Sequence, residues 1–364
     1  MSAMKGAGEL TGAEAESAAA DGAPALEAVS LNKDFRLSGR HQILHAVRDV
    51  SFGLYRGTVL ALVGESGSGK STVARLLAGQ EYPTSGEIRL DGQPVDLSGR
   101  RAFRSHKSQV QLVFQDPFAS LNPVHTVSYH LERPIRLHQG RKTRAEVNQE
   151  VDALLEQVRL VPASQFRGKY PHELSGGQRQ RVSFARALAA KPSVLLADEP
   201  VSMLDVSIRL EMLALLDDLR RRFRLALLYI THDIASARYF ADDVMVMYAG
   251  QIVERGPAEE LTQRPAHPYT QLLVSSAPDP DNLGSTLRAG TGIKSTSNGT
   301  RPTEAGIPAI GCLFAPRCPL ADDHCRAEYP VSQQITPTRS AACWRLDVAA
   351  PELSGPQGGG DTKG

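Results

Sequence analysis

Residues 64–72 read GESGSGKST and fit the pattern G-x-x-x-x-G-K-[ST]. The apolar run VLALV comes directly before this stretch, and the helix-like TVARLLAG follows its lysine and serine. A phosphate chain needs many backbone N–H groups that no side chain obstructs, and glycines allow a loop to curve in that way. The pattern therefore predicts a phosphate-binding loop between a strand and a helix. An ordinary glycine turn is the alternative, and both flanks disfavour it.

Each position of this loop has an expected part in binding a nucleotide. Lys70 would reach the β- and γ-phosphate oxygens, and the Ser71 hydroxyl would ligate Mg²⁺ at the positive end of the helix. The residues predicted to bind the nucleotide here are Gly64, Glu65, Ser66, Gly67, Ser68, Gly69, Lys70, Ser71 and Thr72.

The composition limits the kinds of protein that this chain can be. It has 364 residues, of which 41% are hydrophobic, and a formal net charge of +1. This length suits one large domain with an appendage or two domains, and the charge gives no basic field that argues for nucleic acid. The N-terminus lacks the apolar stretch of a signal peptide, and no apolar run approaches the ~18–20 residues of a membrane-spanning helix. We expect a chain that is not exported and that meets a membrane only peripherally.

The order of apolar patterns predicts the fold class. Short apolar runs alternate with glycine turns from residue 26 to about 113 and read as strands with one helix after Gly69. Residues 125–190 are helical in period, as in VNQEVDALLEQVRLV. Strand-like runs return at SVLLADE and LALLYITHD, with the helix-like SIRLEMLALLDDLRRRF between them. This alternation predicts βαβ units, a parallel sheet and an α/β fold.

Two adjacent carboxylates, Asp198 and Glu199, end the apolar run in SVLLADEP. Carboxylates at the end of a buried strand are costly to leave unpaired. In an enzyme with a phosphate loop of this type, Asp198 would hold Mg²⁺ and Glu199 would polarise the attacking water. A turn with two solvated acids is the alternative, and the phosphate loop upstream makes it the weaker one.

The segment LSGGQ at residues 174–178 resembles the signature sequence of ATP-binding cassette (ABC) ATPases. Further matches to the family's motifs are Gln115 in LVFQDP (the Q-loop), His232 in YITHD (the switch histidine), Asp205 in SMLDVS (the D-loop) and Phe35 in LNKDF (the position that stacks on adenine). The resemblance covers about residues 26–280. It implies the ABC ATPase fold, a P-loop NTPase with a RecA-like core, an antiparallel β subdomain and a helical subdomain.

The resemblance also implies how a complete site is assembled. In this family two cassettes face head to tail, so that residues 175–177 of one chain cap the γ-phosphate held by the other. A Ser-Gly-Gly helix start suits this role because it offers free N–H groups and the positive end of the helix dipole. The catalytic residues would be Glu199, His232 and Gln115, and the Mg²⁺ ligands Ser71, Gln115 and Asp198. The partner chain's ATP would meet Ser175, Gly176, Gly177 and Gln178, and Asp205 would also take part in ATP binding.

The branch of the family is indicated by FQDPFASLNP, YPHELSGGQRQRVSFARAL and RPAHPYTQLLVSSAPDP. These segments resemble the ATPase subunits of bacterial dipeptide and oligopeptide importers, a group that also includes nickel systems. The resemblance implies an ATPase at the cytoplasmic face of the cell membrane that energises uptake of peptides or a similar small solute. A soluble ABC-type ATPase of DNA repair or translation is the alternative, but such proteins usually carry coiled-coil insertions or two cassettes.

The importer resemblance also implies partners and a division of the chain. The expected partners are a second, similar ATPase in a heterodimer, with a homodimer as the alternative, two membrane permeases and, indirectly, a solute-binding protein. A permease helix would dock near residues 115–123. The chain would consist of an ATPase domain (25–280, with the helical subdomain at about 116–190), a linker (281–309) and a Cys-rich extension (310–347), between tails (1–24 and 348–364) whose composition predicts disorder.

The four cysteines of the chain all lie in this C-terminal extension, with the spacing C-x5-C-x6-C-x17-C: Cys312, Cys318, Cys325 and Cys343. Disulfides are not expected in a reducing cytosol. Four thiolates can hold a [4Fe–4S] cluster or zinc, and uncoordinated thiols are the third alternative. The wide gaps differ from the C-x2-C pairs of zinc ribbons. The extension of peptide-importer ATPases can carry a cluster, so the resemblance favours [4Fe–4S] in a structural role.

Two further predictions concern the arginines behind the signature segment and a methionine in the D-loop region. The arginines that follow the signature segment, Arg179, Arg181 and Arg186, are predicted to lie on a solvated helix face. Met203 departs from the family pattern, because close relatives commonly have alanine there. The bulkier methionine side chain affects only the fine packing of the expected dimer interface.

Overall fold

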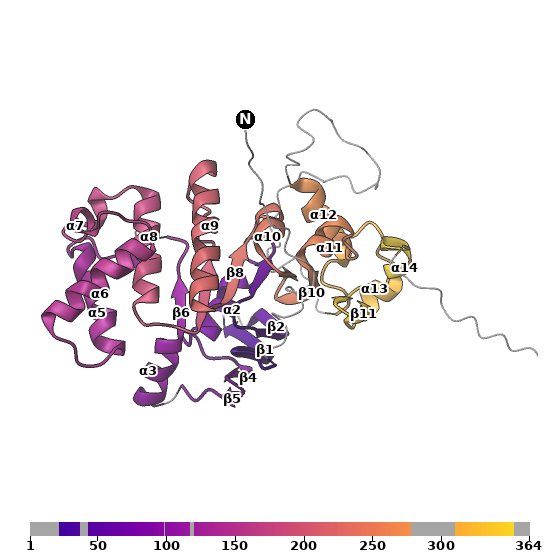
Figure 1. The fold of residues 1–364 in the computed structure, drawn as a ribbon. Helices are drawn as coiled ribbons and strands as arrows, with labels where there is room; N and C mark the ends of the chain where they lie inside the picture. The colour runs from indigo at the N-terminus through magenta and orange to yellow at the C-terminus, as the bar shows by residue number, and fades with distance from the viewer. Residues whose placement is uncertain (1–21, 37–42, 98, 117–119, 278–309, 353–364) are drawn as a thin grey trace, which may run out of the picture.

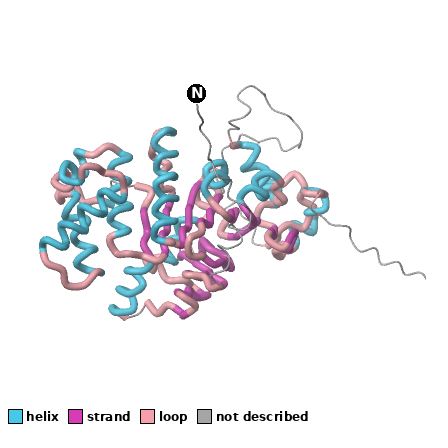
Figure 2. Tube along the Cα trace, viewed as in Figure 1, coloured by secondary structure: helices cyan, strands magenta, loops and turns pink. Residues whose placement is uncertain are grey.

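The computed structural model describes residues 22–36, 43–97, 99–116, 120–277 and 310–352. Within them, strands run through the middle of the molecule and helices lie to both sides (Figures 1 and 2). The predicted linker at 281–309 and most of both predicted tails lie outside the described residues.

The larger sheet has the strand order β11-β12-β10-β9-β3-β8-β7-β6. Its strands are β3 (Val59–Val63), β6 (Val110–Val113), β7 (Val194–Asp198), β8 (Ala226–Thr231), β9 (Asp243–Tyr248), β10 (Gln251–Pro257), β11 (Gln333–Thr336) and β12 (Arg339–Ala341). Strands β9, β3, β8, β7 and β6 are parallel, which confirms the predicted parallel sheet, and β10, β12 and β11 extend it in antiparallel fashion.

Both faces of the parallel part are buried, which explains why its strands are apolar throughout rather than alternating. In β3 the residues Val59, Ala61 and Val63 belong to one hydrophobic core, together with the helices that follow β6. Leu60 and Leu62 point to a second core on the other face. The phosphate loop therefore leaves the sheet from a strand that is fixed on both sides.

A smaller antiparallel sheet covers the second core. Its order is β2-β1-β4-β5, with β1 (Leu26–Arg36), β2 (Ile43–Leu54), β4 (Ser85–Leu90) and β5 (Gln93–Pro94). Inward residues such as Leu26 and Leu31 pack with Val73 of α2 (Lys70–Leu77). Helix α2 is thus held between the small sheet and the large one.

The helices between β6 and β7 gather at one side of the molecule, the left in Figure 1. They are α5 (Val127–His138), α6 (Arg144–Gln157), α7 (Ala163–Phe166), the 3-10 turn η1 (Pro171–Glu173) and α8 (Gly176–Leu188). The helical period at 125–190 is confirmed, and α6 begins at a capping box between Thr143 and Glu146. Helix α9 (Val206–Phe223) stands beside this group and contacts α8.

One helix of the front half departs from the expectation of a single helix after Gly69. Helix α3 (Arg100–Gln109) precedes β6. Its sequence RRAFRSHKSQ has only two apolar residues, so it lacks the apolar stripe on which the prediction depends. Its contact with the interior is polar, because Nε2 of the buried His106 lies 2.7 Å from the Leu77 carbonyl oxygen.

The C-terminal part is joined to the central sheet. It follows α10 (Ile234–Phe240), α11 (Ala258–Gln263) and α12 (Pro268–Ser276), and it contains η3 (Ala315–Arg317), α13 (Asp323–Ala327) and α14 (Leu346–Ala349). Strand β12 pairs with β10, so residues 333–341 become the edge of the large sheet. Helix α14 crosses the predicted end of the extension at residue 347, and Ala350 is buried against Ala266 and Ala341.

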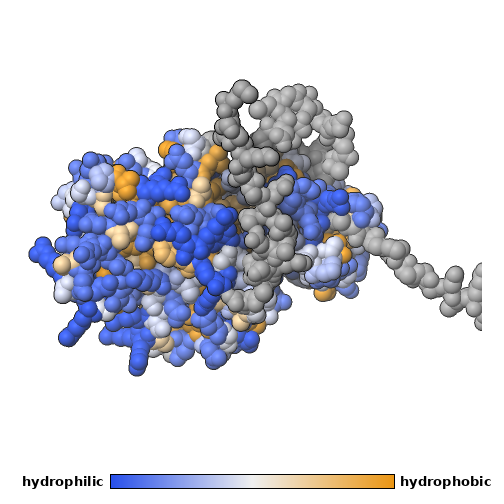
Figure 3. Space-filling model, viewed as in Figure 1, coloured by the Kyte–Doolittle hydropathy of each residue, from blue (hydrophilic) through white to orange (hydrophobic). Residues whose placement is uncertain are grey.

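The described helices include none that is long and apolar enough to cross a bilayer. The face seen in Figure 3 is largely hydrophilic, with small apolar patches scattered over it.

Candidate nucleotide-binding site

The predicted phosphate loop joins β3 to α2, as the sequence predicts. Two of its glycines have no room for a side chain. A Cβ on Gly69, whose φ is 105°, would lie 2.3 Å from the Ala46 carbonyl oxygen, and one on Gly64 would lie 2.2 Å from the carbonyl oxygen of Met247. Glycine is therefore required here by close backbone packing as well as by loop curvature.

Lys70 is buried at the start of α2, and its ammonium rests on the loop itself. Nζ donates to the carbonyl oxygens of Gly64, at 2.7 Å, and Glu65, at 2.8 Å. Burial lowers the pKa of Lys70, while the carboxylates of Glu199, Asp198 and Glu65 oppose this shift. A buried cation that is surrounded by carbonyl and carboxylate oxygens is ready to exchange them for phosphate oxygens.

Ser71 and Asp198 meet at the carboxyl ends of β3 and β7. Ser71 Oγ donates to Asp198 Oδ1 at 3.1 Å, and burial raises the pKa of Asp198, opposed by this hydrogen bond. The buried Ser68 hydroxyl beside them has no hydrogen-bond partner among the described residues. A serine hydroxyl and a carboxylate are hard oxygen ligands, so these residues fit Mg²⁺ held together with a phosphate.

Glu199 lies between the two other predicted catalytic residues. Gln115 Nε2 donates to Glu199 Oε2 at 3.0 Å, and His232 Nδ1 lies 3.3 Å from the same oxygen. Gln115 follows β6, Glu199 ends β7 and His232 follows β8, so the parallel sheet brings all three to one edge. The φ of Glu199 is +47°, a left-handed conformation that is uncommon outside glycine.

The signature segment begins helix α8, and two of its own residues cap the N-terminus of that helix. Ser175 Oγ accepts from the N–H of Gln178 at 3.3 Å, and Gln178 Oε1 accepts from the N–H of Ser175 at 3.1 Å. A Cβ on Gly177 would lie 3.0 Å from Ile208 of α9. The glycines therefore serve packing against α9 in addition to exposing N–H groups, a role that the sequence pattern did not reveal.

The remaining predicted ATP-binding residues lie apart from this cluster of contacts. Phe35 is half-buried in β1, with the Lys33 ammonium 4.8 Å from its ring centre. Asp205 is exposed at the start of α9, and Met203 nearby has 60% of its surface exposed. Adenine stacking by Phe35 and ATP binding by Asp205 stay predictions.

The three arginines behind the signature are not on a solvated face, so that prediction is wrong. Arg181 Nη1 donates to the Val158 carbonyl oxygen at 3.2 Å, and Arg179 Nη1 donates to that of Pro171 at 3.3 Å. Arg186 donates to the Ser120 carbonyl oxygen, and burial lowers its pKa. The helical group packs on this side of α8, and arginine can reach carbonyl groups across it.

Two functional contacts were missed from the sequence. The Arg317 guanidinium pairs with the Glu65 carboxylate of the phosphate loop, and the Tyr269 hydroxyl accepts from the Glu65 N–H at 2.9 Å. No local pattern links positions so far apart in the chain. The only signals available were that Arg317 precedes Cys318 and that Tyr269 lies within the RPAHPYT segment.

The four cysteines are free thiols, and burial is the largest cause of the raised pKa of each. The other three cysteines add to the raised pKa of Cys343 as smaller electrostatic causes. Nevertheless, the described residues contain no group of three or more His, Cys, Asp or Glu arranged to hold a metal ion. As arranged here, the thiols do not fit a cluster or zinc.

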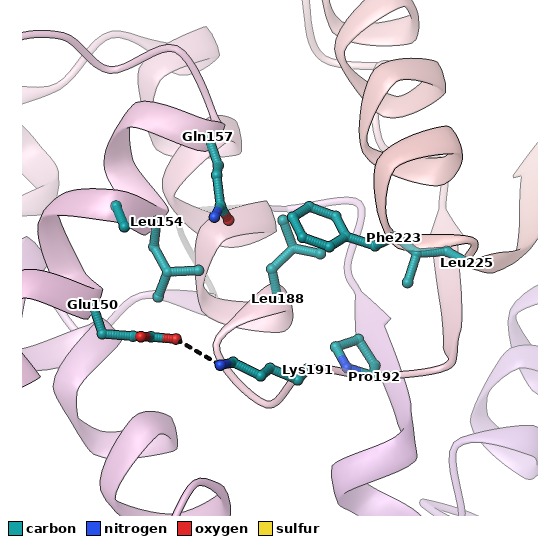
Figure 4. A pocket seen from close by; sticks show the side chains of 9 residues that line it. Glu150, Leu154, Gln157, Leu188, Lys191, Pro192, Phe223 and Leu225 are labelled. Atoms are coloured by element: carbon teal, nitrogen blue, oxygen red, sulfur yellow. Dashed lines mark ion pairs between the residues drawn. The ribbon is translucent and has the colours of Figure 1, made fainter. Parts of the chain in front are cut away.

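A hollow of about 440 Å³ lies between the helical group and the core, among the ends of α6, α8 and α9 (Figure 4). Leu154, Leu188 and Phe223 line it, and an ion pair of 3.1 Å joins Glu150 to Lys191 across its opening. Its lining is mainly apolar and contains none of the predicted nucleotide-binding residues, so it belongs to the junction of the two parts rather than to the ATP site.

Comparison with known proteins agrees with this geometry. Residues 47–202 match the family model "ABC transporter", and residues 253–325 match "Oligopeptide/dipeptide transporter, C-terminal region". The oligopeptide transport ATP-binding protein AppF of Bacillus subtilis is 43% identical over 299 residues, which are 82% of this chain and 88% of that protein. The di/tripeptide transport ATP-binding protein DppF of Pseudomonas aeruginosa is 42% identical over 305 residues, 83% of this chain and 90% of that protein.

Solved structures give the same result. The protein cbiO1 of Clostridium perfringens, part of the ABC transporter complex cbiONQ, has a TM-score of 0.58 and 28% identity, covering 66% of this chain and 91% of that chain. MJ0796, a bacterial ABC transporter cassette solved as a dimer, has a TM-score of 0.58 and 27% identity, covering 64% and 99%. The chain belongs to the family of ABC transporter ATP-binding proteins that carry the oligopeptide/dipeptide transporter C-terminal region.

Proposed function

We propose that this chain is the ATP-hydrolysing subunit of an importer for dipeptides or oligopeptides, acting at the cytoplasmic face of the cell membrane with a second ATPase and two permeases. The observation that carries the proposal is the position of Glu199, between Gln115 and His232 and beside the Ser71–Asp198 pair. The names of the relatives support peptides as the cargo. They do not favour the alternative of a non-transport ATPase.

The residues of one chain account for binding and activation. Lys70 exchanges the carbonyl oxygens of Gly64 and Glu65 for phosphate oxygens of ATP, and the loop N–H groups hold the rest of the phosphate chain. Ser71 and Asp198 would hold Mg²⁺, which would offset the charge of the β- and γ-phosphates. The Glu199 carboxylate accepts a hydrogen bond from the attacking water and orients it in line with the γ-phosphate.

The partner chain supplies the other half of each site. The start of α8 carries free N–H groups and the positive end of the helix dipole. The capping box of Ser175 and Gln178 keeps this helix start in shape before ATP arrives. The similar cassette MJ0796 was solved as a dimer, which supports an arrangement in which two chains face each other.

A groove beside the Q-loop offers the surface for a permease helix. A hollow of about 380 Å³ lies between β6 and α5, lined mainly by Phe114, Tyr129, Arg133, Leu137 and residues of β6. Tyr129 and Leu137 are partly exposed although they are large and apolar. The groove touches Phe114, the neighbour of Gln115, so a helix seated there would act directly on the catalytic residues. Part of the predicted docking segment, 117–119, lies outside the described residues.

The variant Leu137→Asp tests this proposal. A charge at this position should lower peptide uptake by reconstituted transporter at least about tenfold, because a large apolar side chain buried at an interface can carry much of the binding free energy. The basal ATPase rate of the isolated chain should stay within about twofold, since Leu137 does not touch the residues around Glu199. Val331→Asp, another exposed apolar position, is the matched control. Unchanged uptake in Leu137→Asp would contradict docking in this groove.

A metal at the cysteines is implied by the importer resemblance, although the thiols as arranged in this structure do not fit one. It is a separate prediction, and no step above depends on it. Anaerobic purification followed by visible absorption and by iron, sulfide and zinc analysis checks it. The importer resemblance predicts roughly four irons and four sulfides per chain for a [4Fe–4S] cluster. Zinc without iron would replace the cluster with a zinc site, and four titratable thiols with neither metal would agree with the arrangement of the cysteines in this structure.

A further inference from the structure

Glu65 in the phosphate loop is held by a residue of the C-terminal part. Arg317 Nη1 donates to Glu65 Oε2 at 3.0 Å, and Nη2 donates to Oε1 at 2.9 Å. The two residues are 252 positions apart in the sequence. This two-pronged geometry fixes both the distance and the orientation of the carboxylate, which a single contact would not do.

Arg317 is itself held by an aromatic cluster formed by Tyr248, Tyr269 and Phe314. Its guanidinium carbon lies 5.7 Å from the ring centre of Tyr248 and 5.6 Å from that of Phe314. The three rings contact one another with centres 4.7–5.4 Å apart. Stacking on rings restricts the long arginine side chain and lowers the entropy that it loses on pairing.

The same cluster holds the backbone of Glu65, and Glu65 in turn contacts Lys70. The Tyr269 hydroxyl accepts from the Glu65 N–H at 2.9 Å, and the Glu65 carbonyl oxygen accepts from Lys70 Nζ at 2.8 Å. All three groups of this residue, its N–H, its side chain and its carbonyl, are therefore fixed. A displacement of Arg317 would therefore change the contacts of Lys70 through Glu65 alone.

The ion pair is not needed to dock the C-terminal part. Strand β12 is hydrogen-bonded to β10, and the buried Arg339 pairs with the buried Glu254 at 3.0 Å. Tyr329 also accepts from Arg48 Nη1 at 3.1 Å. By comparison, the side chains of Arg317 and Glu65 are both about one third exposed, so their pair adds little to docking. Stabilising the docked C-terminal part therefore does not explain why Arg317 forms a bidentate pair with a residue of the phosphate loop.

We propose that Arg317 is a positioning residue of the ATPase site, which holds the phosphate loop through Glu65 so that Lys70 and the loop N–H groups are already arranged for ATP. The C-terminal part thereby contributes to nucleotide affinity. This inference rests on the proposed ATPase function, and it adds a residue from outside the nucleotide-binding motifs.

Steady-state ATPase kinetics on the full chain test it. Arg317→Gln should raise KM for ATP about three- to tenfold with kcat changed less than about twofold, because the loop is less well arranged before binding. Arg317→Lys should recover only part of the loss, since lysine cannot form the two-pronged pair. Glu65→Gln should give the same KM as Arg317→Gln, and the double variant should be no worse than either.

The matched control is Arg326→Gln, which removes the same charge from an exposed pair with Asp323 in the same part of the chain. Thermal unfolding of all variants distinguishes an ion pair that only stabilises the fold from one that positions the phosphate loop. Additive effects in the double variant, a KM of Arg317→Gln within about twofold of the wild type, or a loss of stability that accounts for the change would overturn the proposal. A wild-type chain and an Arg326→Gln control without ATPase activity would instead contradict the proposed function.

Discussion

Glu199→Gln is expected to lower ATP turnover by about a hundredfold or more while ATP still binds. The amide keeps the size and shape of the side chain, but it cannot accept a proton from the attacking water as the carboxylate can. Gln115 and His232 approach Glu199 from neighbouring strand ends, so the substitution should leave the surrounding geometry in place. Phosphate release measures turnover, and the change in fluorescence of a labelled ATP analogue measures binding.

Glu87→Gln is the control for this loss, because Glu87 is a partly exposed carboxylate on β4 that pairs with Arg89 away from the site. It should turn over ATP like the wild type. Wild-type turnover in Glu199→Gln itself would show that another group activates the water, and the role given to Glu199 would be wrong.

The second large effect is on stability. Arg339→Ala is expected to lower the free energy of unfolding by about 3–5 kcal/mol, because it removes one partner of a buried ion pair. Glu254 would remain in the interior with the N–H groups of Ala266 and His267, at 2.9 and 2.8 Å, as its hydrogen-bond donors. Arg339 also donates to the Arg264 carbonyl oxygen at 2.6 Å, which would lose this contact. Urea unfolding followed by circular dichroism measures the change.

Arg221→Ala is the matched control, since Arg221 pairs with Asp217 at 2.8 Å on an exposed surface. Such a pair contributes less than about 1 kcal/mol. If Arg339→Ala cost no more than this control, the buried pair would not be what holds β12 on the sheet.

The sequence predicted the parts of the fold that depend on local pattern. The phosphate loop, the apolar strands β7 and β8, and helices α6 and α9 follow from residue spacing, and the parallel sheet follows from their order. These strands are buried on both faces, so nearly all their residues are apolar and composition alone identifies them. The cluster of Gln115, Glu199 and His232 then follows from the adjacency of β6, β7 and β8.

What the sequence did not predict depends on contacts between distant residues. Strand β12 has only three residues and no pattern of its own, so its addition to β10 could not be expected. Helix α3 lacks an apolar stripe, and Arg186 is partly buried because its guanidinium donates to the Ser120 carbonyl oxygen of another segment. The Arg317–Glu65 pair likewise requires the fold to be known, because neither residue is unusual in its local sequence.

In the proposed mechanism, ATP joins two chains by lying between the phosphate loop of one and the start of α8 of the other. Light scattering of Glu199→Gln during size exclusion tests it most directly, with Mg-ATP or Mg-ADP, for the chain alone and with the second ATPase of the transporter. The account predicts that Mg-ATP produces a dimer, that Mg-ADP does not, and that adding Ser175→Arg removes the dimer while ATP still binds. ATP binding without any dimer in either setting, or a dimer that forms equally with ADP, would contradict it.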